Sequence, residues 1–229
     1  MYQLPFLQSL ETRARTNKTS SIYEARVLGS DDDFKLRSDI KTRRRTDIPT
    51  TGRIGRLARA IEQDAGHEVL VKVMEDVDQY LSTSNYTEKA AWMRGAIERL
   101  ERLAGVEASG RIMESCGRKC CGLTSRKTAK KLMSETESIA DFIRKLNDIG
   151  LGGGRLQLAD KNTITGGYDR CYCGHVKKTD QPLSSTTYCR CSVGWYKQLF
   201  ESALGRPVDV EIKQSIISGA TSCDFIIHI

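Results

Sequence analysis

The sequence predicts an α+β fold, with an N-terminal helical layer followed by an antiparallel sheet on which one helix packs. Three observations support this. Apolar residues recur at helical spacing between residues 53 and 115, and they alternate at strand spacing after Arg155. An amphipathic run, Val193–Leu204, then precedes two strand-like segments at the C-terminus. At 229 residues, the chain is long enough for one generous domain or two small ones without disulfide support.

Residues 1–50 form a polar, weakly patterned arm that ends near Pro49. Short helices are predicted at Pro5–Arg15 and Asp32–Lys41. The arm is expected to pack on the rest of the chain or on a second subunit, and the latter would make a homodimer. The cluster Arg43–Arg45 would suit a phosphate group, but no aromatic residues interleave with it, which disfavours nucleic-acid binding.

Residues 51–149 are predicted to be helical. Their apolar residues form three stripes: Ile54, Leu57, Ala58 and Ile61; Leu70, Val73, Met74, Val77 and Leu81; Ala90, Met93, Ile97 and Leu100. An internal echo matches Ile61-Glu62 and Gly66 to Leu100-Glu101 and Gly105. It indicates two related helix–turn–helix units in which the glycine breaks the helix, although amphipathic helices also resemble one another by chance.

A further helix is predicted over residues 125–147, with a break near Ser134. Ser134-Glu-Thr-Glu137 has the spacing of a capping box, and Gly150 is a suitable C-cap. The glycine run of residues 150–154 then serves as a hinge. It follows a helix and opens a strand, which is the wrong order for a dinucleotide-binding loop.

Residues 150–229 form the cysteine-rich α+β region. Strands are expected around Leu156–Leu158, around Thr163–Thr165 and from Tyr168 to Cys173. Val208–Ile217 and Ser222–Ile229 should pair as an antiparallel hairpin. The helix between these two sets of strands should bury Val193, Tyr196, Leu199, Phe200 and Leu204.

The eight cysteines carry the functional signal, and five of them lie between Cys171 and Cys223. Cys171 and Cys173 form one close pair, and Cys189 and Cys191 form another. Thiolates two residues apart can turn toward one ion, whereas a disulfide between them would be strained. Metal ligation is therefore the leading interpretation.

A second cysteine cluster comprises Cys116, Cys120 and Cys121. Cys116 and Cys120 would share one face of a continued helix, and Gly117 and Gly122 would let the backbone approach a ligand closely. The nearby cations Arg118, Lys119 and Arg126 would lower the pKa values of the thiols. A ligating or reactive role is preferred over three structural cysteines.

The C-terminal third resembles the 4-vinyl reductase domain family, which includes sensor domains of regulators that respond to aromatic compounds. The resemblance rests on Tyr188-Cys-Arg-Cys-Ser-Val-Gly-Trp195, on Leu204-Gly-Arg-Pro-Val208 and on Gly219-Ala-Thr-Ser-Cys-Asp-Phe225. It implies an apolar cavity closed by the helix and hairpin, a small apolar or aromatic ligand, and a separate output protein.

The resemblance also implies a zinc site, which sensor members build from two cysteines, a glutamate and a further cysteine. Transferred to this sequence, the first ligand falls on Cys189 and the last on Cys223, but Ile212 and Ser215 occupy the middle positions. Glu211 is one residue away and would face the other side of a regular strand. Cys171, Cys173 and Cys191, or the cluster of Cys116, Cys120 and Cys121, are the candidates to complete the set. Cysteine ligands favour zinc or an iron–sulfur cluster.

Composition limits the alternatives. No signal peptide or membrane-spanning run is visible, so a soluble, cytoplasmic protein is expected, and cysteines in a reducing compartment suggest metal or redox chemistry. The net charge of +7 and pI of about 9.0 arise from local clusters, so nucleic acid is a minor candidate partner.

Three functions remain: a metal-bearing small-molecule-binding or sensor module, which is preferred; an enzyme with an open metal site or an iron–sulfur cluster; and a basic interaction protein with structural cysteines.

Overall fold

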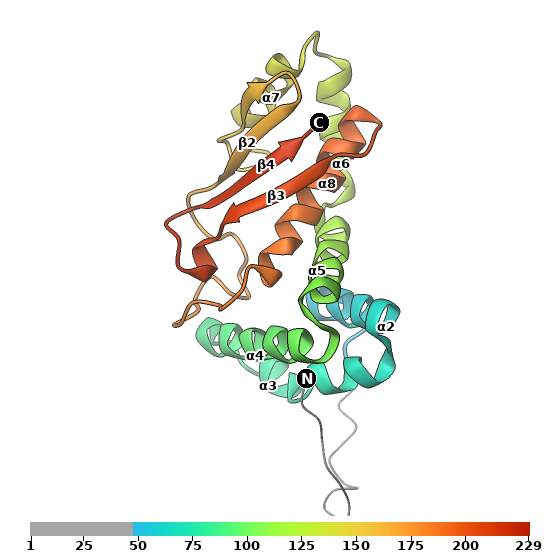
Figure 1. Ribbon diagram of the computed structural model, residues 1–229, viewed down its shortest axis with the longest axis vertical. Coiled ribbons are helices and arrows are strands. Elements are labelled where there is room, and N and C mark those ends of the chain that lie inside the picture. The colour runs from blue at the N-terminus through green and yellow to red at the C-terminus, as the bar shows by residue number, and fades with distance from the viewer. Residues whose placement is uncertain (1–47) are drawn as a thin grey trace, which may run out of the picture. The chain divides into compact units, whose positions relative to one another are not determined.

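A helical part and a sheet part follow one another along the chain, which confirms the α+β class (Figure 1). The computed structural model describes residues 48–229. The two predicted N-terminal helices and the cluster Arg43–Arg45 lie outside the described residues. Thr46–Ile229 forms one compact unit, so the helical part and the sheet part pack together.

The helical part consists of α2 (Gly52–Val73), α3 (Val77–Ser82), α4 (Tyr86–Ala104) and α5 (Val106–Cys120). The predicted stripes lie in one core, except that Leu81 is exposed and Ala90 is buried outside this core cluster. Gly66 interrupts α2 at φ 86° and ψ 170°, and Gly105 separates α4 from α5 at φ 82° and ψ 158°. Both predicted helix breaks are confirmed. Their nearly equal dihedrals lie in a region that only glycine enters readily.

The predicted break in the next helix is also confirmed, because α6 (Leu123–Ser134) and α7 (Ile139–Asp148) are separate. The predicted cap at Ser134 is wrong. The Ser134 hydroxyl donates to the Lys131 carbonyl, whereas the Ser138 hydroxyl accepts the Asp141 N–H at 3.1 Å and begins α7. Helix α7 ends before Gly150, whose φ of 67° reverses the chain.

The sheet has the strand order β1-β2-β4-β3 and is antiparallel throughout the described residues. Its strands are β1 (Gln157–Asp160), β2 (Thr163–Tyr168), β3 (Asp209–Gln214) and β4 (Cys223–His228). The predicted hairpin is therefore confirmed, with a short 3-10 turn, η2 (Ile216–Ser218), in its connection.

The predicted strand from Tyr168 to Cys173 is wrong. Strand β2 ends at Tyr168, and residues 169–186 contain no helix or strand. The amides of Val176 and Lys177 both donate to the Cys173 carbonyl, which closes a turn where an extended chain was expected. A 3-10 turn, η1 (Thr187–Cys189), then leads into α8.

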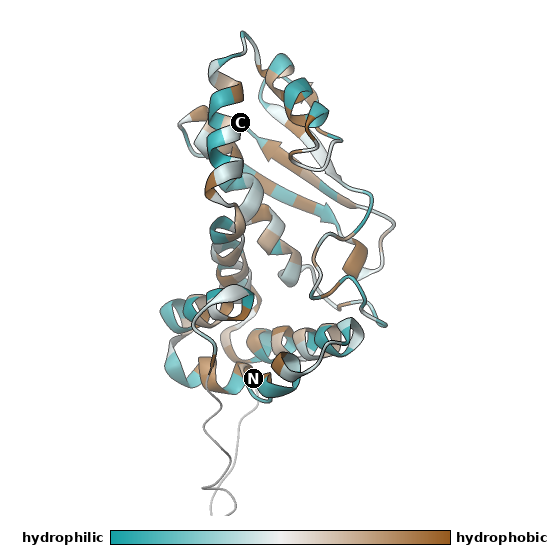
Figure 2. Cartoon of the chain, turned by 180° about the vertical axis from the view of Figure 1, so that it is seen from behind, coloured by the Kyte–Doolittle hydropathy of each residue, from teal (hydrophilic) through white to brown (hydrophobic). Residues whose placement is uncertain are grey.

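Helix α8 (Arg190–Leu204) lies between the sheet and helices α5 and α6 (Figure 1). Apolar residues of α8, α7 and the strands form a second core, and apolar colouring on β4 is visible in Figure 2. Its largest buried members include Phe142, Leu146, Tyr196, Phe200 and Phe225. Leu204, predicted to be buried, is only half-buried. None of the helices in residues 48–229 has the length and apolar character to cross a membrane.

Helices α5 and α8 are in backbone contact at two glycines. A Cβ atom on Gly117 would lie 1.8 Å from the Cys191 carbonyl oxygen, and one on Gly194 would lie 1.9 Å from the Glu114 oxygen. The expectation that Gly117 admits a ligand is therefore wrong, because a neighbouring helix occupies that space. A Cβ atom on Gly122, the other glycine of that expectation, would have no heavy atom of the described residues within 4 Å.

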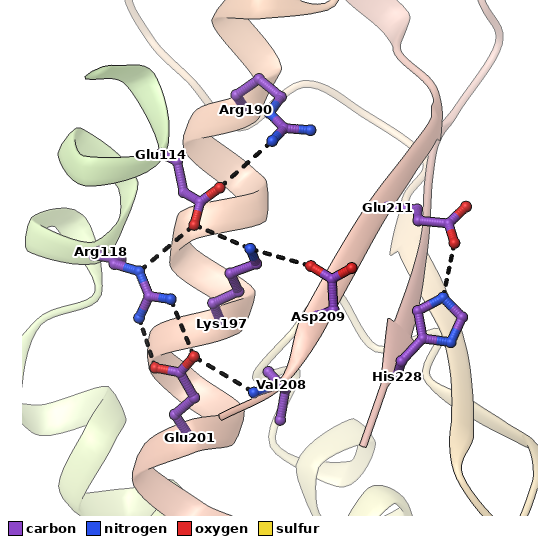
Figure 3. Close-up of polar contacts among 9 residues, drawn as sticks. All are labelled: Glu114, Arg118, Arg190, Lys197, Glu201, Val208, Asp209, Glu211 and His228. Atoms are coloured by element: carbon purple, nitrogen blue, oxygen red, sulfur yellow. Dashed lines mark hydrogen bonds and ion pairs between the residues drawn. The ribbon is translucent and has the colours of Figure 1, made fainter. Parts of the chain in front are cut away.

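Ion pairs reinforce the same helix contact and extend it to the sheet (Figure 3). Arg118 on α5 binds Glu201 on α8 at 2.6 Å, and its hydrogen bond lowers the pKa of the Glu201 carboxyl. Lys197 on α8 lies 3.1 Å from Glu114 and 3.2 Å from Asp209 on β3. These side chains fix the position of α8 relative to both of its neighbours.

Candidate thiol-lined cavity

Six of the eight cysteines line one cavity of about 370 Å³. They come from four parts of the chain: Cys120 from the end of α5, Cys171 and Cys173 from the segment after β2, Cys189 and Cys191 from the junction of η1 and α8, and Cys223 from the start of β4. The cavity lies where the two cores meet, because its lining includes members of both. The structure thus brings together both predicted pairs, Cys223, and Cys120 from the second cysteine cluster.

Backbone packing brings the first thiol pair together. The contact between Gly117 and the Cys191 backbone lies about one helical turn before Cys120. The Cys191 thiol hydrogen-bonds to the Cys120 sulfur, which lowers the pKa of Cys120 and raises that of Cys191. The Arg53 guanidinium, from the first turn of α2, donates to the Cys191 sulfur at 3.6 Å. Burial acts against the charged form of both thiols.

The second thiol pair is Cys189 and Cys223, the two positions that match the resemblance. The Cys189 thiol hydrogen-bonds to Cys223, which lowers the pKa of Cys223 to about 6, and raises that of Cys189. Ser215 contacts the Cys189 sulfur at 2.8 Å, and the Ile216 N–H donates to Cys223 at 3.4 Å. A position that the resemblance assigns to a ligand is therefore next to this pair, although a serine occupies it.

The remaining two cavity thiols belong to the irregular segment after β2. The Cys173 sulfur lies 2.8 Å from the Tyr188 hydroxyl oxygen. Cys171 is half-buried, and burial raises the pKa of its thiol. The Arg53 guanidinium also lies over the Tyr188 ring, 5.6 Å from its centroid. Arg53 therefore contacts both Cys191 and the tyrosine that lies next to Cys173.

Cys116 and Cys121 do not line this cavity. Burial raises the pKa of each to about 11, and both remain thiols at neutral pH. Cys116 donates to the Arg56 carbonyl at 3.7 Å, and Cys121 belongs to the second core. Their positions are those of structural cysteines.

The prediction that Arg118, Lys119 and Arg126 lower the pKa values of the thiols is also largely wrong. Arg118 is held by Glu201 and Glu114, and burial outweighs the effects of Lys119 on Cys116 and of Arg126 on Cys121. The cations that lower the pKa of Cys120 are Arg53 and Arg56 of α2. Sequence reasoning missed them because they lie far from the cysteines along the chain.

The rest of the cavity wall is aromatic, apolar or glycine, with two arginines and Ser192. The rings are Tyr168, Tyr172, Tyr188 and Trp195, the arginines are Arg53 and Arg170, and the glycines are Gly150, Gly152 and Gly153. Tyr168 stands beside Tyr172 and Tyr196, with ring centroids 5.4 and 5.8 Å apart. No aspartate, glutamate, lysine or histidine is among the described lining residues. The wall therefore has positive charge unless its thiols ionise.

The histidines and Glu211 lie elsewhere. Glu211 is exposed on β3 and binds His228 at 2.8 Å (Figure 3), and it is not among the residues that line the cavity. His175 contacts the Tyr80 hydroxyl, and burial lowers its pKa to about 4. His67 pairs with Glu62 on the surface of α2. Within residues 48–229, no three histidine, cysteine, aspartate or glutamate side chains are arranged to hold one metal ion.

A protein-family model described as "Family of unknown function (DUF6144)" matches residues 54–229. The chain belongs to this family. The match begins in α2 and continues to the C-terminus, so it spans both cores and every cavity cysteine. A comparison with curated proteins gives no match.

Proposed function

We propose that the cavity is a cysteine-ligated metal centre in a small-molecule-binding protein. The observation that carries this proposal is the convergence of six thiols from four separate segments on one cavity. Cysteines in a core that needs only packing would be dispersed and surrounded by apolar atoms, as Cys121 is. All eight cysteines are free thiols, so no disulfide accounts for the arrangement.

The donor set fits a soft metal. Thiolates are the preferred ligands of zinc and of iron–sulfur clusters, and they disfavour magnesium and calcium. Zinc and a cluster both remain candidates for a cavity of about 370 Å³ that six thiols line. A cluster would supply electron transfer or a Lewis-acidic iron, and Cys120, Cys189, Cys191 and Cys223 would be its principal ligands.

The resemblance to the 4-vinyl reductase domain family is part of this proposal. It would make the chain a sensor module that acts on a separate output protein, in the reducing environment of the cytoplasm. The contact between Cys189 and Ser215, the residue after β3, supports the location of the site that this resemblance implies.

The test is elemental analysis and absorption spectroscopy of the full chain purified without oxygen. We expect iron and sulfide with visible charge-transfer absorption, or zinc near one equivalent if the centre is a single ion. Cys189→Ser and Cys223→Ser should each reduce metal content severalfold and destabilise the C-terminal half.

Cys121→Ser is the matched control, because Cys121 is a buried cysteine outside the cavity. It should keep the full metal content. Protein that contains no metal when prepared without oxygen, or unchanged metal in the Cys189 and Cys223 variants, would refute the proposed site.

A further inference from the structure

Arg53 is half-buried, and its guanidinium has no carboxylate partner in residues 48–229. Its contacts there are the Cys191 sulfur at 3.6 Å and the face of the Tyr188 ring. A guanidinium has five N–H donors, and one thiol satisfies few of them. A guanidinium at the wall of a concave site is well suited to pair with an anion.

The cavity contributes no carboxylate to that balance, and its acidic groups are the thiols, of which Cys223 has a pKa of about 6. Arg53 and Arg170 both line it, whereas its described lining contains no aspartate or glutamate. Arg170 is exposed to solvent, and its guanidinium lies over the Tyr172 ring, 4.9 Å from the centroid. This contact keeps the Arg170 side chain at the cavity wall. The two guanidinium groups provide positive charge at the wall of a concave space, which attracts anions.

The other lining residues favour a ligand whose remaining part is apolar. Trp195, Tyr168, Leu151, Val176 and Ile217 present apolar surface to the cavity. A volume of about 370 Å³ lies within the usual range for sites that bind small organic molecules. A fully hydrated inorganic anion would leave these apolar walls in contact with water.

We propose that the cavity binds a small organic carboxylate, with the carboxylate on Arg53 and the apolar body against Trp195 and Tyr168. Arginine matches a carboxylate through two parallel N–H···O bonds, which a single ammonium group does not provide. The inference rests on the proposed function of the cavity as a binding site and adds the chemical class of its ligand. It does not require the metal.

The experiment is calorimetric titration of the full chain with hexanoate and benzoate, each compared with its neutral amide, and with inorganic phosphate. We expect each carboxylate to bind about tenfold or more tightly than its amide, because only the carboxylate makes a charge-assisted pair. Phosphate should bind more weakly than either carboxylate.

Variants locate the charge. Arg53→Gln should remove the preference for the carboxylate, and Arg53→Lys should keep part of it because the charge remains while the paired geometry is lost. Arg170→Gln should cause a smaller loss, since its side chain is exposed. Arg111→Gln, at an exposed arginine of α5 outside the cavity, is the matched control and should bind like the parent. Thermal unfolding of each variant shows whether it is folded.

Equal affinity for acid and amide, tighter binding of phosphate, or unchanged binding in folded Arg53→Gln would overturn the inference. Metal content measured on the same samples separates the two proposals. Carboxylate binding by protein that never contains metal would support this inference and refute the metal centre. Metal without carboxylate preference would do the reverse.

Discussion

The close glycine contact between α5 and α8 and the thiol-lined cavity lie about one helical turn apart. At Gly117 and Gly194, helices α5 and α8 are so close that neither glycine has room for a methyl group. Near Cys120 and Cys191 the same helices border a cavity of about 370 Å³. Interiors are normally filled to crystal-like density, so a cavity of this size beside such a close contact departs from ordinary packing. The glycine contact positions the thiols, and the cavity leaves them free to bind.

The largest expected effect comes from breaking the tight side. Gly117→Ala should destabilise the fold by roughly 3 kcal/mol, because its Cβ would force α5 and α8 apart. It should also separate Cys120 from Cys191. Urea unfolding measures the first effect, and metal content measures the second.

Gly110→Ala on the same helix is the control for that change. An added Cβ there lies 3.6 Å or more from its nearest neighbours, which are atoms of the Arg190 side chain. Alanine should then stabilise α5 by about 0.5 to 1 kcal/mol through its helix propensity. If both glycine variants were equally stable, the close contact would not determine the packing.

A second comparison separates packed thiols from cavity thiols. Cys121→Ser should cost roughly 1 to 3 kcal/mol, because its hydroxyl would be buried in the second core. In metal-free protein, Cys171→Ser should cost less than about 0.5 kcal/mol, since Cys171 is half-buried at the cavity wall. Urea unfolding of the two metal-free variants gives the difference, and a reversed order would contradict the assignment of roles.

The ion pairs around α8 should have a smaller, pH-dependent effect. Arg118 lowers the pKa of Glu201, so this stabilisation is complete above the unfolded pKa and is lost as the pH falls through the folded pKa. Glu201→Gln should cost about 1 kcal/mol at neutral pH. When the pH is lowered below the pKa of the Glu201 carboxyl in the unfolded chain, the variant should lose less stability than the parent. Chemical unfolding at several pH values measures the stability of both proteins. If both lose the same stability as the pH falls, the ion pair is unimportant.

Much of the fold could be predicted from local patterns. The stripes of α2 and α4 repeat at helical spacing, and Gly66 and Gly105 stand where the chain must adopt positive φ. The β3–β4 hairpin follows from alternation and a glycine turn. Predictions failed where competing local signals existed: Ser138 begins α7 although Ser134 also had capping spacing, and the segment after Tyr168 turns at Cys173.

The candidate site could be predicted only in part. Close spacing indicated the pairs Cys171 with Cys173 and Cys189 with Cys191, and the resemblance indicated Cys189 and Cys223. It did not reveal that Cys120 contacts Cys191 while its neighbour Cys121 belongs to another core. Adjacent residues on a helix point in different directions, so one faces the cavity and the next does not.

By itself, the sequence determined the order of helices and strands and the supply of thiols, because periodicity and residue type act over a few neighbouring residues. Only the tertiary structure decided which thiols meet, and that Arg53 joins them. Those contacts depend on how closely α5 and α8 approach and on where β4 begins beside β2. Such distances are set by packing between segments that are remote in the chain.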